Sequence, residues 1–204
     1  MEPFPEMQRG FEDPVWRESD SKRLRRAKNL LGILLAIVLV TLLFIFGEPS
    51  LSELQTLHRD DWLGFAAVGL PIGGFLFTTV THELLHWIPD QLFGYDPRLS
   101  ISPNPHVIVL EEYKSRSEMM MTLILPFAGL NLSLIPFLIF DVSPVMTYSA
   151  VYVLLLNSMF SGSDIYEFLF LIREPRGTML YAKECNGGYR TYRFHPIQTK
   201  EKSS

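Results

Sequence analysis

Four long apolar segments dominate the sequence and limit the folds that it can adopt. The first, Leu30 to Phe46, contains 17 residues without a charged side chain. At a rise of 1.5 Å per residue, a helix of this length just spans the hydrocarbon core of a bilayer. Inside a membrane every backbone polar group must be satisfied within the protein, which favours helices. The sequence therefore predicts an all-α polytopic membrane protein with about four transmembrane helices, over residues 30–46, 62–88, 119–140 and 145–164.

Two of these segments contain residues that disturb a regular helix. Pro71, Gly73 and Gly74 lie in the middle of the second segment and predict a kink or close helix packing there. The fourth apolar stretch continues past Asp164 to Ile172, which is too long for one straight span. We expect a bend at residues 161–163, with the remainder near the membrane interface.

Polar segments flank the predicted membrane domain, which we place at residues 29–173. Residues 1–28 are polar, contain three prolines and end in a basic cluster, so we expect a mostly disordered N-terminal arm. Residues 174–204 form a polar tail. The chain would thus consist of one four-span domain between two polar ends.

Two short β-hairpins are predicted in the polar parts of the chain. Residues 98–102 and 106–111 alternate in polarity and contain β-branched side chains. In the tail, residues 178–182 and 189–194 flank Asn186-Gly187-Gly188, which is a strong turn signal. Both hairpins are expected on the same side of the membrane.

The distribution of basic residues predicts the orientation. The arm, the loop at residues 90–118 and residues 173–204 hold 7, 3 and 7 of the 18 lysines and arginines, whereas the other side holds only Arg59. By the positive-inside rule, both termini and the middle loop are cytoplasmic, and the protein is a multi-pass protein of the cell membrane.

Composition excludes several classes of function. The net charge is −4, and the chain has no basic stripe with interleaved aromatic residues, so it is not expected to bind nucleic acid. Cys185 is the only cysteine, which excludes an intramolecular disulfide and a cysteine-based zinc cluster.

The second apolar segment ends in His82-Glu83-Leu84-Leu85-His86, the pattern H-E-x-x-H. Positions i and i+4 share one face of a helix, so both histidines can bind a single metal ion. Glu83 lies beside that face, where its carboxylate can act as the general base towards a water on the metal. A chance match is the alternative, but ionisable residues inside a membrane span are costly and persist mainly for function.

Asp164 is the predicted third metal ligand. The second and fourth segments run in the same direction, and His82 and Asp164 lie 20 and 19 residues after Trp62 and Val145, which gives both a similar depth near the cytoplasmic face. A catalytic zinc takes three protein ligands and keeps one position for water. Alternatively, Ser163 or Asp164 caps a final helical segment.

Three further polar residues have more than one interpretation. Asn157 lies two helical turns before Asp164 and could bind a ligand, the metal-bound water or substrate, or join helices. Asn131 is expected to join helices. His106 could be a fourth ligand or a surface histidine. The ligand types indicate zinc, although two histidines and one aspartate can also hold iron or cobalt.

The H-E-x-x-H at the cytoplasmic end of a second span, and a late Ser161-Gly162-Ser163-Asp164 followed by an apolar run and Pro175, resemble the zincin peptidase family of prokaryotic membrane proteins. The likeness covers roughly Leu30 to Phe194. The arrangement is also similar to the site-2 intramembrane metalloproteases, in which two such histidines and a later aspartate bind zinc and the glutamate is the general base.

Carried over, this resemblance implies that His82, His86 and Asp164 bind zinc and that Glu83 is the base. The chain departs from the site-2 pattern by having Leu84-Leu85 between the histidines and Ile165 after the aspartate. Metal binding is less affected by these departures than any specific choice of substrate.

The sequence thus predicts a zinc-dependent metalloprotease that hydrolyses peptide bonds at or near the cytoplasmic membrane face. Its expected partners are the lipid bilayer and a membrane protein or peptide substrate, which could pair with a strand of the 98–111 hairpin. A non-catalytic metal-binding scaffold or regulatory protein is the main alternative, and a metal transporter is a third. The sequence leaves the oligomeric state and the substrate open.

Overall fold

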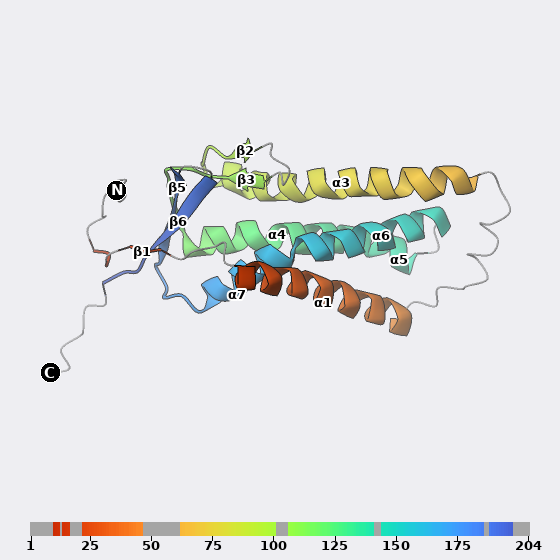
Figure 1. Cartoon of the computed structure of the whole chain (residues 1–204), viewed down its shortest axis with the longest axis horizontal. Helices are drawn as coiled ribbons and strands as arrows, with labels where there is room; N and C mark the ends of the chain where they lie inside the picture. The colour runs from red at the N-terminus through yellow and green to blue at the C-terminus, as the bar shows by residue number, and fades with distance from the viewer. Residues whose placement is uncertain are drawn as a thin grey trace.

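The computed structural model describes most of the chain, and the labels below are those of Figure 1. Helices account for most of the described residues, with two small sheets in addition. The described residues are 10–12, 14–16, 22–46, 62–100, 106–140, 144–185 and 188–197.

Four long helices, α1, α3, α4 and α6, lie side by side along the long axis of the molecule, and the strands gather at one end of them (Figure 1). Helix α7 continues the direction of the chain after α6 and packs against α1 and α4. The helices are α1 (Lys22–Phe46), α3 (Trp62–Leu92), α4 (Arg116–Leu134), α5 (Pro136–Ile139), α6 (Pro144–Phe160) and α7 (Gly162–Ile172).

One helical stretch among the described residues, Arg116–Ile139, is long and apolar enough to cross a membrane by length and composition. It coincides with the predicted third span. Four transmembrane helices therefore stay a prediction. Helices α1 and α3 nevertheless expose many large apolar side chains, among them Leu30, Leu34, Ile37, Leu42, Ile72, Phe75, Leu76, Val80 and Leu84.

Helix α3 runs unbroken through Pro71 and Pro89 to Leu92, four residues beyond the predicted end at residue 88. Of the two predictions for its middle, close packing is observed. A Cβ atom on Gly74 would lie 2.7 Å from the ring of Tyr152, so α6 approaches α3 closely at this glycine. The absence of a side chain at Gly74 thus allows α3, which carries the H-E-x-x-H, to pack closely against α6.

The fourth apolar stretch is interrupted where a break or bend was predicted. Helix α6 ends at Phe160 and α7 begins at Gly162. A Cβ atom on Gly162 would lie 2.6 Å from both the backbone N of Gly32 and the carbonyl oxygen of Lys28. Only glycine therefore allows the backbone of α1 to contact the start of α7.

Both predicted hairpins are confirmed, and one of them belongs to a larger sheet. Strands β2 (Arg98–Ser100) and β3 (His106–Ile108) pair antiparallel. Strands β5 (Met179–Cys185) and β6 (Gly188–Phe194) form the tail hairpin. They are the centre of a four-stranded sheet in the order β1-β6-β5-β4.

The two outer strands of this sheet were not predicted. Strand β1 (Val15–Trp16) pairs with β6, and β4 (Tyr113–Ser115) pairs with β5. The expectation of a mostly disordered arm is therefore wrong for these two residues and for 22–28, where α1 already begins. Backbone pairing with the tail supplies the order that the composition of the arm does not predict.

The sheet packs against the helices through a small apolar core. Leu180 of β5 contacts Leu123 of α4 and Leu171 of α7, and Met119 and Phe168 pack around them. This core joins the sheet to α4 and α7. Helix α4 packs against α3, which carries the H-E-x-x-H, and α7 carries the predicted third ligand.

Candidate metal centre

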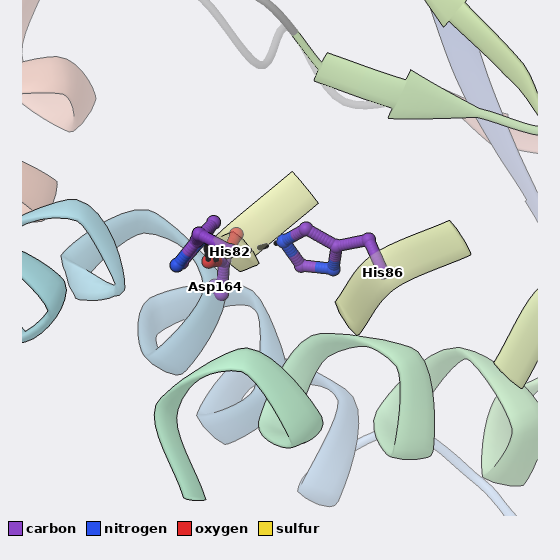
Figure 2. A group of neighbouring side chains, drawn as sticks. All are labelled: His82, His86 and Asp164. Atoms are coloured by element: carbon purple, nitrogen blue, oxygen red, sulfur yellow. Dashed lines mark hydrogen bonds and ion pairs between the residues drawn. The ribbon is translucent and has the colours of Figure 1, made fainter. Parts of the chain in front are cut away.

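The structure brings His82 and His86 of α3 together with Asp164 of α7 through their side chains (Figure 2). One carboxylate oxygen of Asp164, Oδ2, lies 3.0 Å from Nε2 of His82 and 3.4 Å from Nε2 of His86. The nearest ligand atoms of all three residues lie within 4.8 Å of one another. Residues separated by nearly 80 positions in the sequence therefore form one compact cluster.

Each histidine reaches the cluster because of its position on α3. His82 and His86 are one helical turn apart, so their side chains lie on the same face. Their rings meet edge to face with centroids 5.0 Å apart. His82 is buried, and His86 is partly exposed at the edge of the cluster.

Asp164 lies in the first turn of α7, where a carboxylate interacts favourably with the helix dipole. The N-cap position itself is occupied by Ser161, which makes no side-chain capping bond. The alternative that Ser163 or Asp164 is the N-cap of this segment is therefore wrong, and Oδ2 of Asp164 is directed to the two histidines instead.

Asn157 fixes the orientation and tautomer of His82. The amide nitrogen of Asn157 donates to the carbonyl oxygen of Pro126 at 3.2 Å and to Oδ1 of Asn131 at 2.9 Å. Its own Oδ1 therefore faces Nδ1 of His82, at 3.0 Å. Because this oxygen can only accept, Nδ1 carries a proton, and Nε2, which lies 3.0 Å from Oδ2 of Asp164, is the nitrogen that would bind a metal ion.

A backbone carbonyl fixes the orientation and tautomer of His86. Nδ1 of His86 donates to the carbonyl oxygen of Thr122 on α4 at 2.9 Å. A carbonyl oxygen can only accept, so Nδ1 of His86 carries a proton and Nε2 is the nitrogen that would bind a metal ion. Hydrogen bonds thus fix the outer nitrogens of both imidazoles, which is the usual arrangement around protein-bound zinc.

The three side chains fit a zinc ion. Ligand atoms that bind zinc tetrahedrally at about 2.0–2.1 Å lie about 3.3 Å from one another. The two distances to Oδ2 of Asp164, 3.0 and 3.4 Å, are close to this spacing. Two neutral nitrogens and one carboxylate oxygen also match the ligand chemistry of catalytic zinc, which leaves a fourth position for water.

Glu83 lies beside the cluster and does not belong to it. Its Oε2 accepts a hydrogen bond of 2.9 Å from the backbone N–H of Val107 in β3. Strand β3 therefore turns one backbone donor away from β2 and towards α3. The β2–β3 hairpin is thereby attached next to the H-E-x-x-H.

The remaining candidates lie apart from the three ligands or outside the described side chains. Asn131 joins α4 to Asn157 of α6, as expected of a helix-joining residue. The side chains of His106 and Cys185 lie outside the described residues, so the fourth-ligand prediction for His106 stays a prediction. His195, in the tail, pairs with Glu174 at 2.7 Å.

Sequence reasoning missed Thr122, whose contribution to the cluster is a backbone carbonyl and has no signature in the residue type. It also missed Asp90, although Asp90 lies one helical turn after His86 and so shares its face. The spacing H-x-x-x-D was the available signal.

A family model described as "Putative zincin peptidase" matches residues 75–179, a little more than half of the chain. The chain belongs to this family. The matched region begins within α3 and ends at the first residue of β5, so it contains His82, Glu83, His86, Asn157 and Asp164. No curated protein and no solved structure matches the chain.

Membership of the zincin peptidase family points to a metalloprotease in general terms, and the name of the family implies zinc. The clustered side chains of His82, His86 and Asp164 could hold this metal ion.

Proposed function

We propose that the protein is a zinc-dependent metalloprotease in which His82, His86 and Asp164 bind the metal and Glu83 is the general base. The observation that carries this proposal is the convergence of the two Nε2 atoms on one carboxylate oxygen, while hydrogen-bond acceptors hold both Nδ1 atoms. Histidines that bind zinc usually have their outer nitrogens fixed in this way.

A zinc ion held by these residues supplies Lewis acidity and lowers the pKa of a bound water from 15.7 to about 7. Glu83 accepts the proton of the attacking water and returns it to the leaving amine. Asn157 and the carbonyl of Thr122 keep the two imidazoles in place during this exchange.

The proposal includes four transmembrane helices with both termini in the cytoplasm and the metal site near the cytoplasmic face. It is supported by the apolar stretch Arg116–Ile139 and by the exposed apolar side chains of α1 and α3. The proposed substrate is a membrane protein or peptide that is cleaved in an extended conformation. The backbone N–H of Val107 lies next to Glu83, so an extended segment that pairs with β3 would pass beside the base.

A non-catalytic metal-binding scaffold is the second candidate. It is favoured by one contact, the hydrogen bond from Val107 to Glu83, because a carboxylate used to attach a hairpin has a structural role of its own.

Zinc analysis of purified protein, combined with cleavage of candidate single-span membrane proteins, tests these functions. We expect about one zinc per chain in the wild type and loss of most of it in Asp164→Ala. Glu83→Gln should retain zinc and lose cleavage by at least about 10²-fold, as expected for a general base. The control Glu112→Gln should cleave normally, since that carboxylate accepts from the backbone N–H of Asp96 and not from a site residue.

Retention of full zinc by Asp164→Ala would contradict the ligand assignment. Unchanged cleavage, or an unchanged cellular phenotype, in Glu83→Gln would contradict catalysis and favour the scaffold.

A further inference from the structure

Three polar side chains form a second buried network beside the metal centre. Asp90, Lys114 and Thr122 expose only 3%, 6% and 5% of their surfaces. The ammonium group of Lys114 donates to Oδ1 of Asp90 and, at 2.8 Å, to the hydroxyl of Thr122. The same hydroxyl donates to Oδ1 of Asp90 at 2.6 Å. Each of the three residues thus contacts the other two.

The network joins three elements, of which α3 and α4 also contribute to the metal centre. Asp90 is on α3, Lys114 is on β4 and Thr122 is on α4. Burial lowers the pKa of Lys114, and the hydrogen bond to Asp90 opposes this shift. A buried pair of opposite charges is costly to assemble and costly to break by removal of one partner, so it fixes the relative positions of its elements.

Thr122 connects this network directly to a metal ligand. Its carbonyl oxygen accepts from Nδ1 of His86, and its hydroxyl donates to Asp90. His86 and Asp90 are one turn apart on the same face of α3. One residue of α4 therefore contacts two successive turns of α3, through its backbone and through its side chain.

This double contact determines how α4 lies against the histidines. If α4 shifted along α3, the hydroxyl of Thr122 would lose a buried carboxylate and an ammonium partner, and the carbonyl would move away from Nδ1 of His86. The first loss is the more expensive, because hydrogen bonds to charged groups are stronger than those between neutral groups.

We propose that Asp90, Lys114 and Thr122 are positioning residues for zinc binding: the buried network holds the Thr122 carbonyl at the place where it orients His86. This inference rests on the proposed zinc site and extends it to residues that do not touch the metal. A purely structural ion pair would stabilise the fold without affecting the affinity for zinc.

The test is the Kd of the purified full-length protein for zinc, measured by competition with a chromophoric chelator. Thr122→Val keeps the branched shape and the backbone carbonyl but removes the hydroxyl. It should weaken zinc binding by up to about 10–100-fold, the range for losing an outer partner of a metal ligand, because the carbonyl would no longer be held against His86. Thr122→Ser restores the hydroxyl and should bind zinc within about threefold of the wild type.

Ser115→Ala is the matched control. Ser115 is the N-cap of α4, and its hydroxyl accepts from the backbone N–H of Glu118. Its removal loosens the same end of α4 without touching the network, so the melting temperature should fall while the Kd for zinc stays at the wild-type value. If Thr122→Val does not fold, the double variant Asp90→Leu/Lys114→Met, which replaces the charges by apolar side chains, should show the same loss of zinc affinity.

A wild-type Kd in Thr122→Val would overturn the inference while leaving the metal site intact. Equal weakening in Thr122→Val and Ser115→Ala would also overturn it, because general loosening of α4 would then explain both. A wild-type protein that binds no zinc would overturn the proposed function itself.

Discussion

The imidazole of His82 is held by the side-chain amide of Asn157, and that amide is oriented by other hydrogen bonds. Asn157 directs its nitrogen to Pro126 and Asn131, and this leaves only its oxygen for His82. Without that oxygen, the ring of His82 could present either nitrogen to the cluster. The tautomer of a metal ligand therefore depends on a residue of another helix.

Asn157→Ala should weaken zinc binding by about 10–100-fold, because it removes the hydrogen bond that fixes the outer nitrogen of His82. Asn131→Ala is the control, since it removes one acceptor of the Asn157 amide and leaves Pro126 in place. Its effect should be clearly smaller. Equal affinities for zinc in Asn157→Ala and the wild type, measured by chelator competition, would contradict this role.

At this scale the residue types and spacings predicted that His82, His86 and Asp164 lie together, with Asn157 next to them. His82 and His86 follow from helical periodicity alone, and Asp164 follows from equal depth in two parallel segments. Thr122 could not be found in this way, because any residue offers the same carbonyl. The partner of Asn157 could not be predicted either, because the metal, its water and a histidine would all lie within reach of this side chain. The structure shows that the partner is His82.

Helix α7 carries Asp164, and its position depends on the contact of Gly162 with α1. The backbone of α1 occupies the space that a side chain at Gly162 would need. A salt bridge of 2.8 Å between Lys28 and Glu167 joins the same two helices one turn later. The start of α7 is therefore fixed by its contacts with α1.

Gly162→Ala should destabilise the protein by about 1–3 kcal/mol, because the added Cβ must displace backbone atoms. It should also weaken zinc binding, since Asp164 lies two residues further on. Gly73→Ala is the control: no atom lies within 4 Å of the added Cβ, and alanine favours a helix. Thermal unfolding in detergent measures the stability, and the Kd measures zinc binding. Wild-type values of both in Gly162→Ala would show that α1 does not hold α7 in place.

Among the elements, the long helices and both hairpins could be predicted from apolar length and turn residues. The separate start of α7 was predicted from the excess length of the fourth stretch. Strands β1 and β4 could not be predicted, because two or three residues carry no periodic signal and their partners lie far away in the sequence. Helix α3 extends beyond its predicted end at residue 88 to Leu92. Pro89 is accommodated within the helix because tertiary packing can outweigh the low helix propensity of proline.

The whole molecule has its strands at one end of the helices, where α3 ends and α4 begins (Figure 1). Basic residues of the predicted cytoplasmic segments lie in or next to these strands, including Arg98, Lys114 and Arg193. The proposed orientation places this end of the molecule in the cytoplasm.

Cysteine labelling checks this orientation. In a Cys185→Ser background, which has no other cysteine, Ile197→Cys places a thiol at a residue that is 54% exposed. A membrane-impermeant maleimide should label it only after permeabilisation. Ser50→Cys, on the predicted outer side, should be labelled in intact cells and serves as the control. Labelling of Ile197→Cys in intact cells would contradict the orientation and the depth of the metal site together.

The four-stranded sheet is built from the start, the middle and the end of the chain, and this has a consequence for the order of synthesis. Strand β4, which carries Lys114, pairs only with β5, and β1 pairs only with β6 among the described residues. A chain still on the ribosome can have made both histidines while it lacks Asp164 and strand β5, the partner of β4. The proposed ligands and the sheet beside them are therefore complete only after β6 has been synthesised, so a shorter nascent chain lacks a proposed ligand or part of the sheet.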